Sequence, residues 1–379
     1  MDFILTDEQS LLRATVRAFA EREIRPHVMQ WDEAQEFPTA VFRAMGEAGF
    51  LGTVVPESLG GPGLGALEFA LVMEEISRVD PSVGLTMAGH SGLCLQHLLL
   101  FANESQAAKY VPSLAAGTSV GSWCLTEPGS GSDASGMRTQ AILDGDSYVL
   151  TGSKAFITNG SHASTYVVLA KTDTAAGTKG ISALIVERSF PGVSVGKKEN
   201  KLGMRASDTA QMNFDNVRVP RVNLLGKEGE GFRQALTVLD TGRIGVAALS
   251  VGLAQGALDA AVRYARERKQ FGKALAEFQG IQFSLADMAT ELTAARWLTY
   301  RAAAMKQRGE DINLSAAQAK YFASEAAQRI ATAAVQIHGG YGFIKEYPVE
   351  KFYRDVKLLT IGEGTSEVQK MVIAKNLLR

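Results

Sequence analysis

A glutamate near the C-terminal end has the surroundings expected of a general base. Glu363 has a glycine on each side, and Thr365 and Ser366 follow the second glycine, where either can cap a following helix. The glycines let a ligand approach the carboxylate, and the helix start offers unpaired N–H groups. A loop glutamate is normally a solvated surface charge, but the glycines and the apolar Ile361 favour a buried carboxylate with a raised pKa.

Two earlier segments contain residue types that can hold a planar, polar ligand. The run Trp123–Asp133 (WCLTEPGSGSD) is rich in small residues that present N–H and hydroxyl donors to a closely approaching molecule. In Lys154–Gly160 (KAFITNG), Phe156 can stack on a ring while Thr158 hydrogen-bonds to its edge. Taken singly, such segments are more often an ordinary turn and a core phenylalanine.

Two segments of the C-terminal half are candidates for phosphate binding. In Arg266–Gly272 (RERKQFG), Arg268 lies near a helix end and can clamp a pyrophosphate, although basic residues there usually only complement the helix dipole. In Gln336–Gly342 (QIHGGYG), paired glycines end a helix. No triad member or second metal ligand accompanies His338, so we interpret it as a structural histidine.

Three blocks of secondary structure must position these segments. Helical periodicity fills residues 1–118 and opens with a capping box of Thr6 and Gln9. Short β-rich runs separated by turn residues fill residues 119–228, and long, Ala-rich amphipathic helices fill residues 229–379. We therefore predict an α+β multidomain protein with an N-terminal helical domain, a middle antiparallel β domain and a C-terminal four-helix bundle. The clearest strands are expected at 148–151, 165–169, 181–186 and 210–214, and the long helices at 232–268, 277–308 and 315–337.

Composition excludes several functional classes. A formal net charge of −1 over 379 residues gives no general attraction to nucleic acid or anionic membranes. Two cysteines without zinc spacing indicate neither a disulfide framework nor a metal site. Residues 1–5 lack the basic start of a signal peptide, and the apolar stretches are broken before they reach the length of a membrane span. We expect a cytoplasmic protein, or a mitochondrial matrix protein if the chain is a processed eukaryotic form.

Together and in this order, the segments resemble the acyl-CoA dehydrogenase family from end to end. The resemblance is strongest to the short-chain, butyryl-CoA type. It is carried by five stretches, namely 125–133 (LTEPGSGSD), 240–247 (DTGRIGVA), 268–272 (RKQFG), 336–342 (QIHGGYG) and 363–367 (EGTSE).

The resemblance implies an FAD cofactor and assigns residues to it. Thr126 and Thr158 would bond the pyrimidine side of the flavin, whereas Arg268, Gln279 and the 336–340 segment would hold the pyrophosphate and adenosine of a neighbouring subunit's FAD. The full set of expected FAD contacts is Trp123, Leu125, Thr126, Ser132, Phe156, Ile157, Thr158, Arg268, Gln270, Phe271, Gln279, Gln336, Ile337, Gly339, Gly340, Thr365 and Glu367. Many relatives have Trp where this chain has Phe156, a change that keeps the stacking face but loses the indole N–H.

The resemblance also implies the reaction. Glu363 would take the α proton of an acyl-CoA thioester while flavin N5 accepts the β hydride, giving a trans-2-enoyl thioester. A ribityl hydroxyl of FAD and the backbone N–H of the base would polarise the thioester oxygen. Substrate contacts are expected from Ser132, Asp240, Arg243, Glu363 and Gly364. The family's alternative base position is Gly242 here, which argues against the isovaleryl and long-chain types.

Partners and alternatives follow from the same resemblance. We expect an electron-transfer flavoprotein as electron acceptor and a homotetramer built as a dimer of dimers, with no nucleic-acid partner. Branched-chain or carrier-bound acyl substrates, a flavin oxidase and a non-enzymatic helical scaffold remain alternatives. Chain length is expected to depend on residues 82–94 and 236–254, and one methylene changes selectivity only by ~1–3 kcal/mol.

Overall fold

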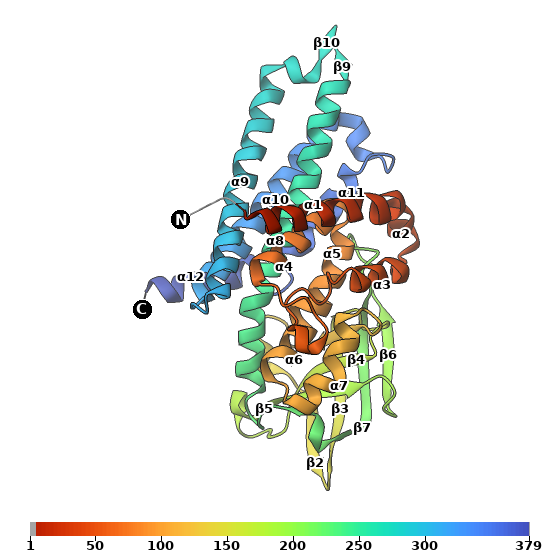
Figure 1. Ribbon diagram of the computed structural model, residues 1–379, viewed down its shortest axis with the longest axis vertical. Helices are drawn as coiled ribbons and strands as arrows, with labels where there is room; N and C mark the ends of the chain where they lie inside the picture. Colours follow the sequence, from red (N-terminus) through yellow and green to blue (C-terminus); the bar gives the residue numbers. More distant parts are fainter. Residues whose placement is uncertain (1–4, 379) are drawn as a thin grey trace.

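The computed structural model describes residues 5–378 and arranges them in three parts (Figure 1). N-terminal helices cross the middle of the molecule, a β-sheet lies at one end, and α8 and α9 project from the other end. The expectation that no signal peptide is present concerns residues 1–5, of which 1–4 lie outside the described residues.

The N-terminal part is helical, as predicted. The Thr6 hydroxyl accepts the Gln9 N–H at 3.2 Å and the Gln9 side chain accepts the Thr6 N–H at 3.0 Å, so the predicted capping box is present. Its elements are α1 (Asp7–Phe19), η1 (Ala20–Ile24), η2 (Arg25–His27), α2 (Val28–Ala34), α3 (Thr39–Glu47), η3 (Glu57–Leu59), α4 (Ala66–Val79), α5 (Pro81–Met87), η4 (Ala88–Leu95), α6 (Gln96–Phe101) and α7 (Glu104–Ala115). Helical periodicity does not predict the π-helices η1 and η4, and such segments are frequent at functional sites.

The middle part is one sheet in the order β6-β7-β3-β2-β4-β5-β8, with β1 paired to β4. Its strands are β1 (Gly121–Cys124), β2 (Gln140–Asp144), β3 (Ser147–Thr158), β4 (Thr165–Lys171), β5 (Ile181–Glu187), β6 (Val193–Lys198), β7 (Thr209–Pro220) and β8 (Leu224–Leu225). The prediction of an antiparallel domain is wrong for β1, which runs parallel to β4, and for the one register pair that joins β2 to β4. Parallel partners need a long connection, and β2 and β3 provide it.

The C-terminal part is a bundle around α8 (Gly231–Glu267). It continues through β9 (Lys269–Gln270), β10 (Lys273–Ala274), η8 (Leu275–Glu277), α9 (Gln279–Gln307), α10 (Asn313–His338), η9 (Gly339–Phe343), α11 (Val349–Val356), η10 (Lys357–Thr360) and α12 (Ser366–Leu377). Within the described chain, α8 alone has the length and hydropathy of a membrane span, but 89% of its most apolar window is buried inside the protein. Helix α8 is therefore apolar because it packs in the core of the protein.

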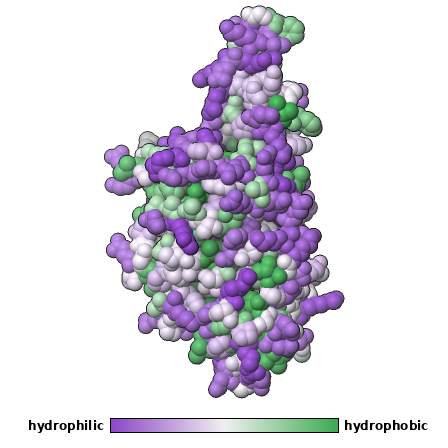
Figure 2. Space-filling model, turned by 90° about the vertical axis from the view of Figure 1, so that its right-hand side faces the viewer, coloured by the Kyte–Doolittle hydropathy of each residue, from purple (hydrophilic) through white to green (hydrophobic). Residues whose placement is uncertain are grey.

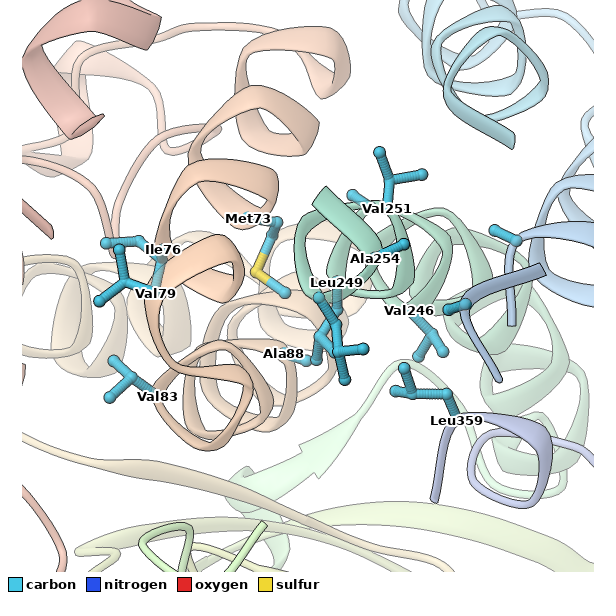
Figure 3. Packing of buried hydrophobic residues seen from close by; sticks show 14 of the residues in the cluster. Met73, Ile76, Val79, Val83, Ala88, Val246, Leu249, Val251, Ala254 and Leu359 are labelled. Atoms are coloured by element: carbon cyan, nitrogen blue, oxygen red, sulfur yellow. The ribbon is translucent and has the colours of Figure 1, made fainter. Parts of the chain in front are cut away.

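The largest hydrophobic core joins the first and third parts. Figure 3 shows Met73 of α4 directed at Leu249 of α8, with Ala88 beside them. Leu359 closes the same cluster from the segment that leads to Glu363. The sequence-distant helices α4, η4 and α8 thus form one packed unit next to the predicted base.

Candidate active site

The loop that carries Glu363 is held in an unusual backbone conformation. Glu363 has φ +52° in the left-handed region, which is uncommon for a residue other than glycine. Thr365 caps α12 by accepting the Val368 N–H at 3.3 Å. The side-chain amide of Gln369 donates to the carbonyls of Glu363 at 3.3 Å and Gly364 at 3.0 Å. The start of α12 therefore fixes the loop and turns the Glu363 side chain inward.

The Glu363 carboxylate packs against α8 at Gly242. Its Oε2 atom is buried and has no hydrogen-bond partner within the described chain. A Cβ placed on Gly242 would lie 2.3 Å from that oxygen and 2.9 Å from Leu93 Cδ2, so the carboxylate occupies the space that a side chain at 242 would need. Burial raises the pKa of Glu363 to about 7, and the cations of Lys320 and Arg243 only partly oppose this shift.

A buried lysine lies behind the same loop. Lys320 of α10 is fully buried, and its Nζ donates to the Gly364 carbonyl at 2.6 Å. No carboxylate forms an ion pair with this ammonium among residues 5–378, and burial lowers the pKa of Lys320 to about 8. Sequence reasoning missed Lys320; the one available signal was a lysine on the apolar face of an Ala-rich helix.

The predicted substrate contacts Asp240 and Arg243 lie on α8 on either side of Gly242 in the sequence. Arg243 is buried and forms an ion pair with Asp240 at 2.5 Å, while Asn313 Nδ2 donates to Asp240 at 3.1 Å. Burial lowers the pKa of Arg243 and raises that of Asp240. The Nε of Arg243 has no partner within the described residues, so this group can still donate to a ligand.

The two predicted flavin segments lie side by side. The Ala155 N–H donates to the Thr126 carbonyl at 2.8 Å. Beneath them the buried Lys154 Nζ donates to Leu125 O at 3.0 Å and to Glu127 Oε1 at 2.8 Å. This Lys154–Glu127 pair was not predicted, because its two residues meet only after β3 folds against the 123–133 segment. It fixes the spacing of the two segments.

Phe156 projects from an irregularity in β3. The pairing of β3 with β7 shifts register between Lys154 and Ile157, and Phe156 has φ +55°. Such bulges redirect a side chain, and the Phe156 side chain is 66% exposed whereas Ile157 is buried. Thr158 follows at the end of the strand, where its Cγ2 lies 2.9 Å from a Cβ built on Gly89 of η4.

Other predicted cofactor residues lie in the 123–133 segment and in the Glu363 loop. The indole N–H of Trp123 donates a hydrogen bond to His97 Nδ1 at 2.9 Å, so this donor is not available to a ligand. Ser132 is exposed in the loop that Ser130 and Asp133 close by a 2.5 Å hydrogen bond. Gly364, Thr365 and Glu367 belong to the Glu363 loop and the first turn of α12.

A second group of predicted residues lies at the opposite end of α8. An open pocket of about 500 Å³ brings together Arg268, Gln270, Ile337, Gly339 and Gly340. The Arg268 guanidinium lies 5.2 Å from the centre of the Tyr341 ring. Gln279 begins α9 and Gln336 lies in the last turn of α10 near this pocket, but neither lines it.

Neither the hairpin tip nor His338 has the geometry of a catalytic group. Phe271 is 94% exposed at the β9–β10 turn, and Figure 2 shows hydrophobic atoms at the end of this projection. His338 lines the Arg268 pocket, hydrogen-bonds to Ala334 O at 2.8 Å and stacks on Tyr264 at 4.2 Å, contacts that are compatible with its predicted structural role. No group of three potential metal ligands occurs in residues 5–378.

Comparison with known proteins agrees with this geometry. The acyl-CoA dehydrogenase N-terminal, middle and C-terminal domain models match residues 6–118, 122–217 and 229–378. The short-chain specific acyl-CoA dehydrogenase of Clostridium acetobutylicum is 46% identical over 100% of both chains. Butyryl-CoA dehydrogenase from Megasphaera elsdenii superimposes with TM-score 0.98 at 44% identity, also over 100% of both chains.

A third similar protein comes from a structure described as an electron transferring flavoprotein of Acidaminococcus fermentans. That chain has TM-score 0.99 and 48% identity, and each chain is covered completely. Three domain models in sequence and full-length relatives of this identity leave one conclusion, which the predicted segments and helix–sheet–helix order also indicated. The chain belongs to the acyl-CoA dehydrogenase family of enzymes.

Proposed function

We propose that the protein oxidises a short-chain acyl-CoA to the trans-2-enoyl-CoA with FAD as cofactor and Glu363 as the base. The observation that supports this most directly is the buried Glu363 Oε2, which has no partner in the described chain and a pKa near 7. A general base works best when its pKa lies near the working pH. The named short-chain and butyryl-CoA relatives support the choice of a short acyl group.

The residues present fit FAD. The exposed ring of Phe156 offers a stacking face, and the hydroxyls of Thr126 and Thr158, from the hydrogen-bonded segments that flank it in sequence and in space, would hydrogen-bond the flavin. The pocket at Arg268 supplies a cation and closely approachable glycine backbone, which suit a pyrophosphate. When bound, FAD would supply a two-electron acceptor for the hydride that leaves the β carbon.

The protein's own contribution is to remove a weakly acidic proton. Glu363 Oε2 points away from water onto the backbone of Gly242, so an acyl chain running along this face of α8 would present its α carbon to the carboxylate. Lys320 fixes the Gly364 carbonyl, which keeps the Glu363 side chain in place. The backbone N–H of Glu363 would polarise the thioester carbonyl and stabilise the negative charge that develops as the proton leaves.

The separation of the two predicted FAD regions supports an oligomer. Arg268 caps α8 roughly 39 Å along the helix from Gly242, at a rise of 1.5 Å per residue. Gly242 packs against Glu363 in the loop that precedes the predicted FAD contacts Thr365 and Glu367. One FAD cannot contact both regions of the same chain. We therefore propose that Arg268 of one chain completes the FAD site beside Glu363 of another, in a homotetramer arranged as a dimer of dimers. An electron-transfer flavoprotein is the proposed electron acceptor, as the A. fermentans relative suggests.

Anaerobic titration of the flavin absorbance with butyryl-CoA tests the proposal. The wild-type protein should bleach, whereas Glu363→Gln should retain FAD and fail to bleach on the same time scale. Glu47→Gln removes an exposed carboxylate at the end of α3 and should behave like wild type. A wild-type protein that binds FAD but is not reduced by any acyl-CoA would overturn the function. Normal bleaching of Glu363→Gln would overturn only the assignment of the base.

A further inference from the structure

The acyl end of the site is outlined by three positions without side chains. On α8, Gly242 supports the Glu363 carboxylate, and Gly245 lies on the same face about 4.5 Å further along the helix axis. On η4, Leu93 touches the Gly242 position, and Gly92 precedes it. Helices α8 and η4 therefore face each other with little side-chain volume between them next to the base.

One aromatic side chain from a third element occupies this space. Phe69 belongs to α4 and is 7% exposed. Its Cε1 lies 3.5 Å from a Cβ built on Gly245, and its Cζ lies 3.8 Å from a Cβ built on Gly92. Both distances are ordinary van der Waals contacts. The ring edge therefore lies close to the side-chain-free faces of both Gly92 and Gly245.

We propose that Phe69 is the floor of the acyl pocket and limits the substrate to short, apolar chains. This inference rests on the proposed function and adds a residue that determines specificity. One turn beyond Gly242, the ring blocks the path along α8 that a longer acyl chain would follow. Phe69 belongs to the same hydrophobic cluster as Met73, Ala88 and Leu249, which Figure 3 shows packed together, and these residues provide no group to pair with a polar chain end.

The glycines make this arrangement sensitive to the size of residue 69. When a core ring is truncated, neighbouring side chains usually relax into part of the space. Phe69 contacts two glycine positions, Gly92 and Gly245, and a glycine has no side chain that could move into the vacated space. A smaller residue should therefore leave an open extension of the pocket that begins one helical turn from Glu363.

The test compares chain-length profiles of Phe69→Leu and Phe69→Ala with wild type. Each methylene accommodated in an apolar pocket changes kcat/KM by roughly 10–200-fold. We expect the octanoyl-CoA to butyryl-CoA ratio of kcat/KM to rise at least tenfold in Phe69→Leu, and further in Phe69→Ala. Phe19→Leu is the matched control, because Phe19 is a buried phenylalanine of α1 that packs on Phe50. Its ratio should equal that of wild type.

The outcomes separate the two proposals. If wild type oxidises butyryl-CoA but the Phe69 variants keep its ratio, the floor assignment is wrong and the function stands. If wild type prefers octanoyl-CoA, the assignment is also wrong, because an intact Phe69 would not limit the chain. If wild type oxidises no acyl-CoA, both proposals are overturned. Should Phe69→Ala fail to fold, the smaller truncation in Phe69→Leu still decides between these results.

Discussion

At the Glu363 end of α8 the side chains of Lys320 and Arg243 and one carboxylate oxygen of Glu363 are buried, whereas the Arg268 end is open to solvent. Glu363, Lys320 and Arg243 all have pKa values shifted by burial. At the other end, Arg268 lines an open pocket and Phe271 is almost fully exposed. A region that performs acid–base chemistry must exclude water within its own chain, because solvent would return these pKa values to normal.

The exposed end has a different requirement. A phosphate-binding surface can stay hydrated until its ligand arrives, because an arginine can form charge-assisted hydrogen bonds with a phosphate without being buried beforehand. Phe271, at the turn beside it, is 94% exposed, and in the proposed oligomer a neighbouring chain would cover it. In the proposed oligomer, the Glu363 end of α8 therefore carries out the acid–base chemistry, and the Arg268 end contributes FAD-binding energy to the site of a neighbouring chain.

The strongest test of the chemical end is Glu363→Gln. Loss of the base should slow flavin reduction by ~10²–10⁴-fold while FAD stays bound. In wild type, kcat/KM should rise with pH through about 7, since only the ionised carboxylate accepts a proton and burial raises its pKa to that value. Stopped-flow absorbance across pH 5–9 measures both. A flat wild-type profile would show that another group is the base.

A second test of the Glu363 end moves the catalytic carboxylate from residue 363 to residue 242 of α8. A Cβ on residue 242 would lie 2.3 Å from Glu363 Oε2, so Gly242→Glu needs the 363 side chain removed. Glycine also suits the φ of +52° at 363. We expect Glu363→Gly with Gly242→Glu to be at least tenfold faster than Glu363→Gly alone. Glu363→Gln with Gly242→Glu should show no gain, because Gln keeps the clash. Equal rates for both double variants would contradict the packing described for Gly242.

The exposed end is tested by Arg268→Gln. Loss of a charge-assisted hydrogen bond of about 1.5–3 kcal/mol should weaken FAD binding by roughly 10–100-fold. Activity should return when excess FAD is added, as measured by fluorescence titration and turnover. Co-expressing Arg268→Gln with Glu363→Gln should restore up to half of the wild-type activity, because mixed oligomers then contain intact sites. No recovery in verified mixed oligomers would overturn the two-chain site.

The smallest expected effect concerns Lys320. Its cation opposes the rise in the pKa of Glu363, so removing the charge should raise that pKa further. In Lys320→Met the ascending limb of the pH profile should therefore move above pH 7, and activity at pH 7 should fall severalfold. Lys320→Gln keeps a donor for the Gly364 carbonyl but loses the charge. It should show the same pH shift with a higher plateau rate at high pH than Lys320→Met. An unchanged limb in both variants would limit Lys320 to a structural role.

Local signals predicted much of the fold. The Thr6–Gln9 box and the long helices of the bundle depend on residues close in sequence, and the structure contains both. The parallel pairing of β1 and the π-helix η4 were not predicted. Both depend on contacts between residues far apart, which no local pattern records.

In the candidate site too, features that depend on neighbouring residues in the sequence were predicted, and features that depend on distant residues were not. The surroundings of Glu363 indicated a buried carboxylate, because the glycines and the helix cap lie within a few residues of it. Lys320, the Lys154–Glu127 pair and Phe69 could not be found, since each gains its meaning from a partner on another element. The bulge that exposes Phe156 likewise arises from the pairing of β3 with β7.

The close approach of α4 and α8 has a consequence for how the chain reaches its native state. A Cβ on Gly252 would lie 2.3 Å from Glu74 O, and one on Gly256 would lie 2.3 Å from Arg78 O. Each glycine lowers the intrinsic stability of an isolated helix by about 1 kcal/mol relative to alanine. Helix α8 should therefore be only marginally stable until α4 docks against it. We expect residues 5–118 and 229–378 to fold as one cooperative unit, with a single unfolding transition, although the sheet separates them along the chain.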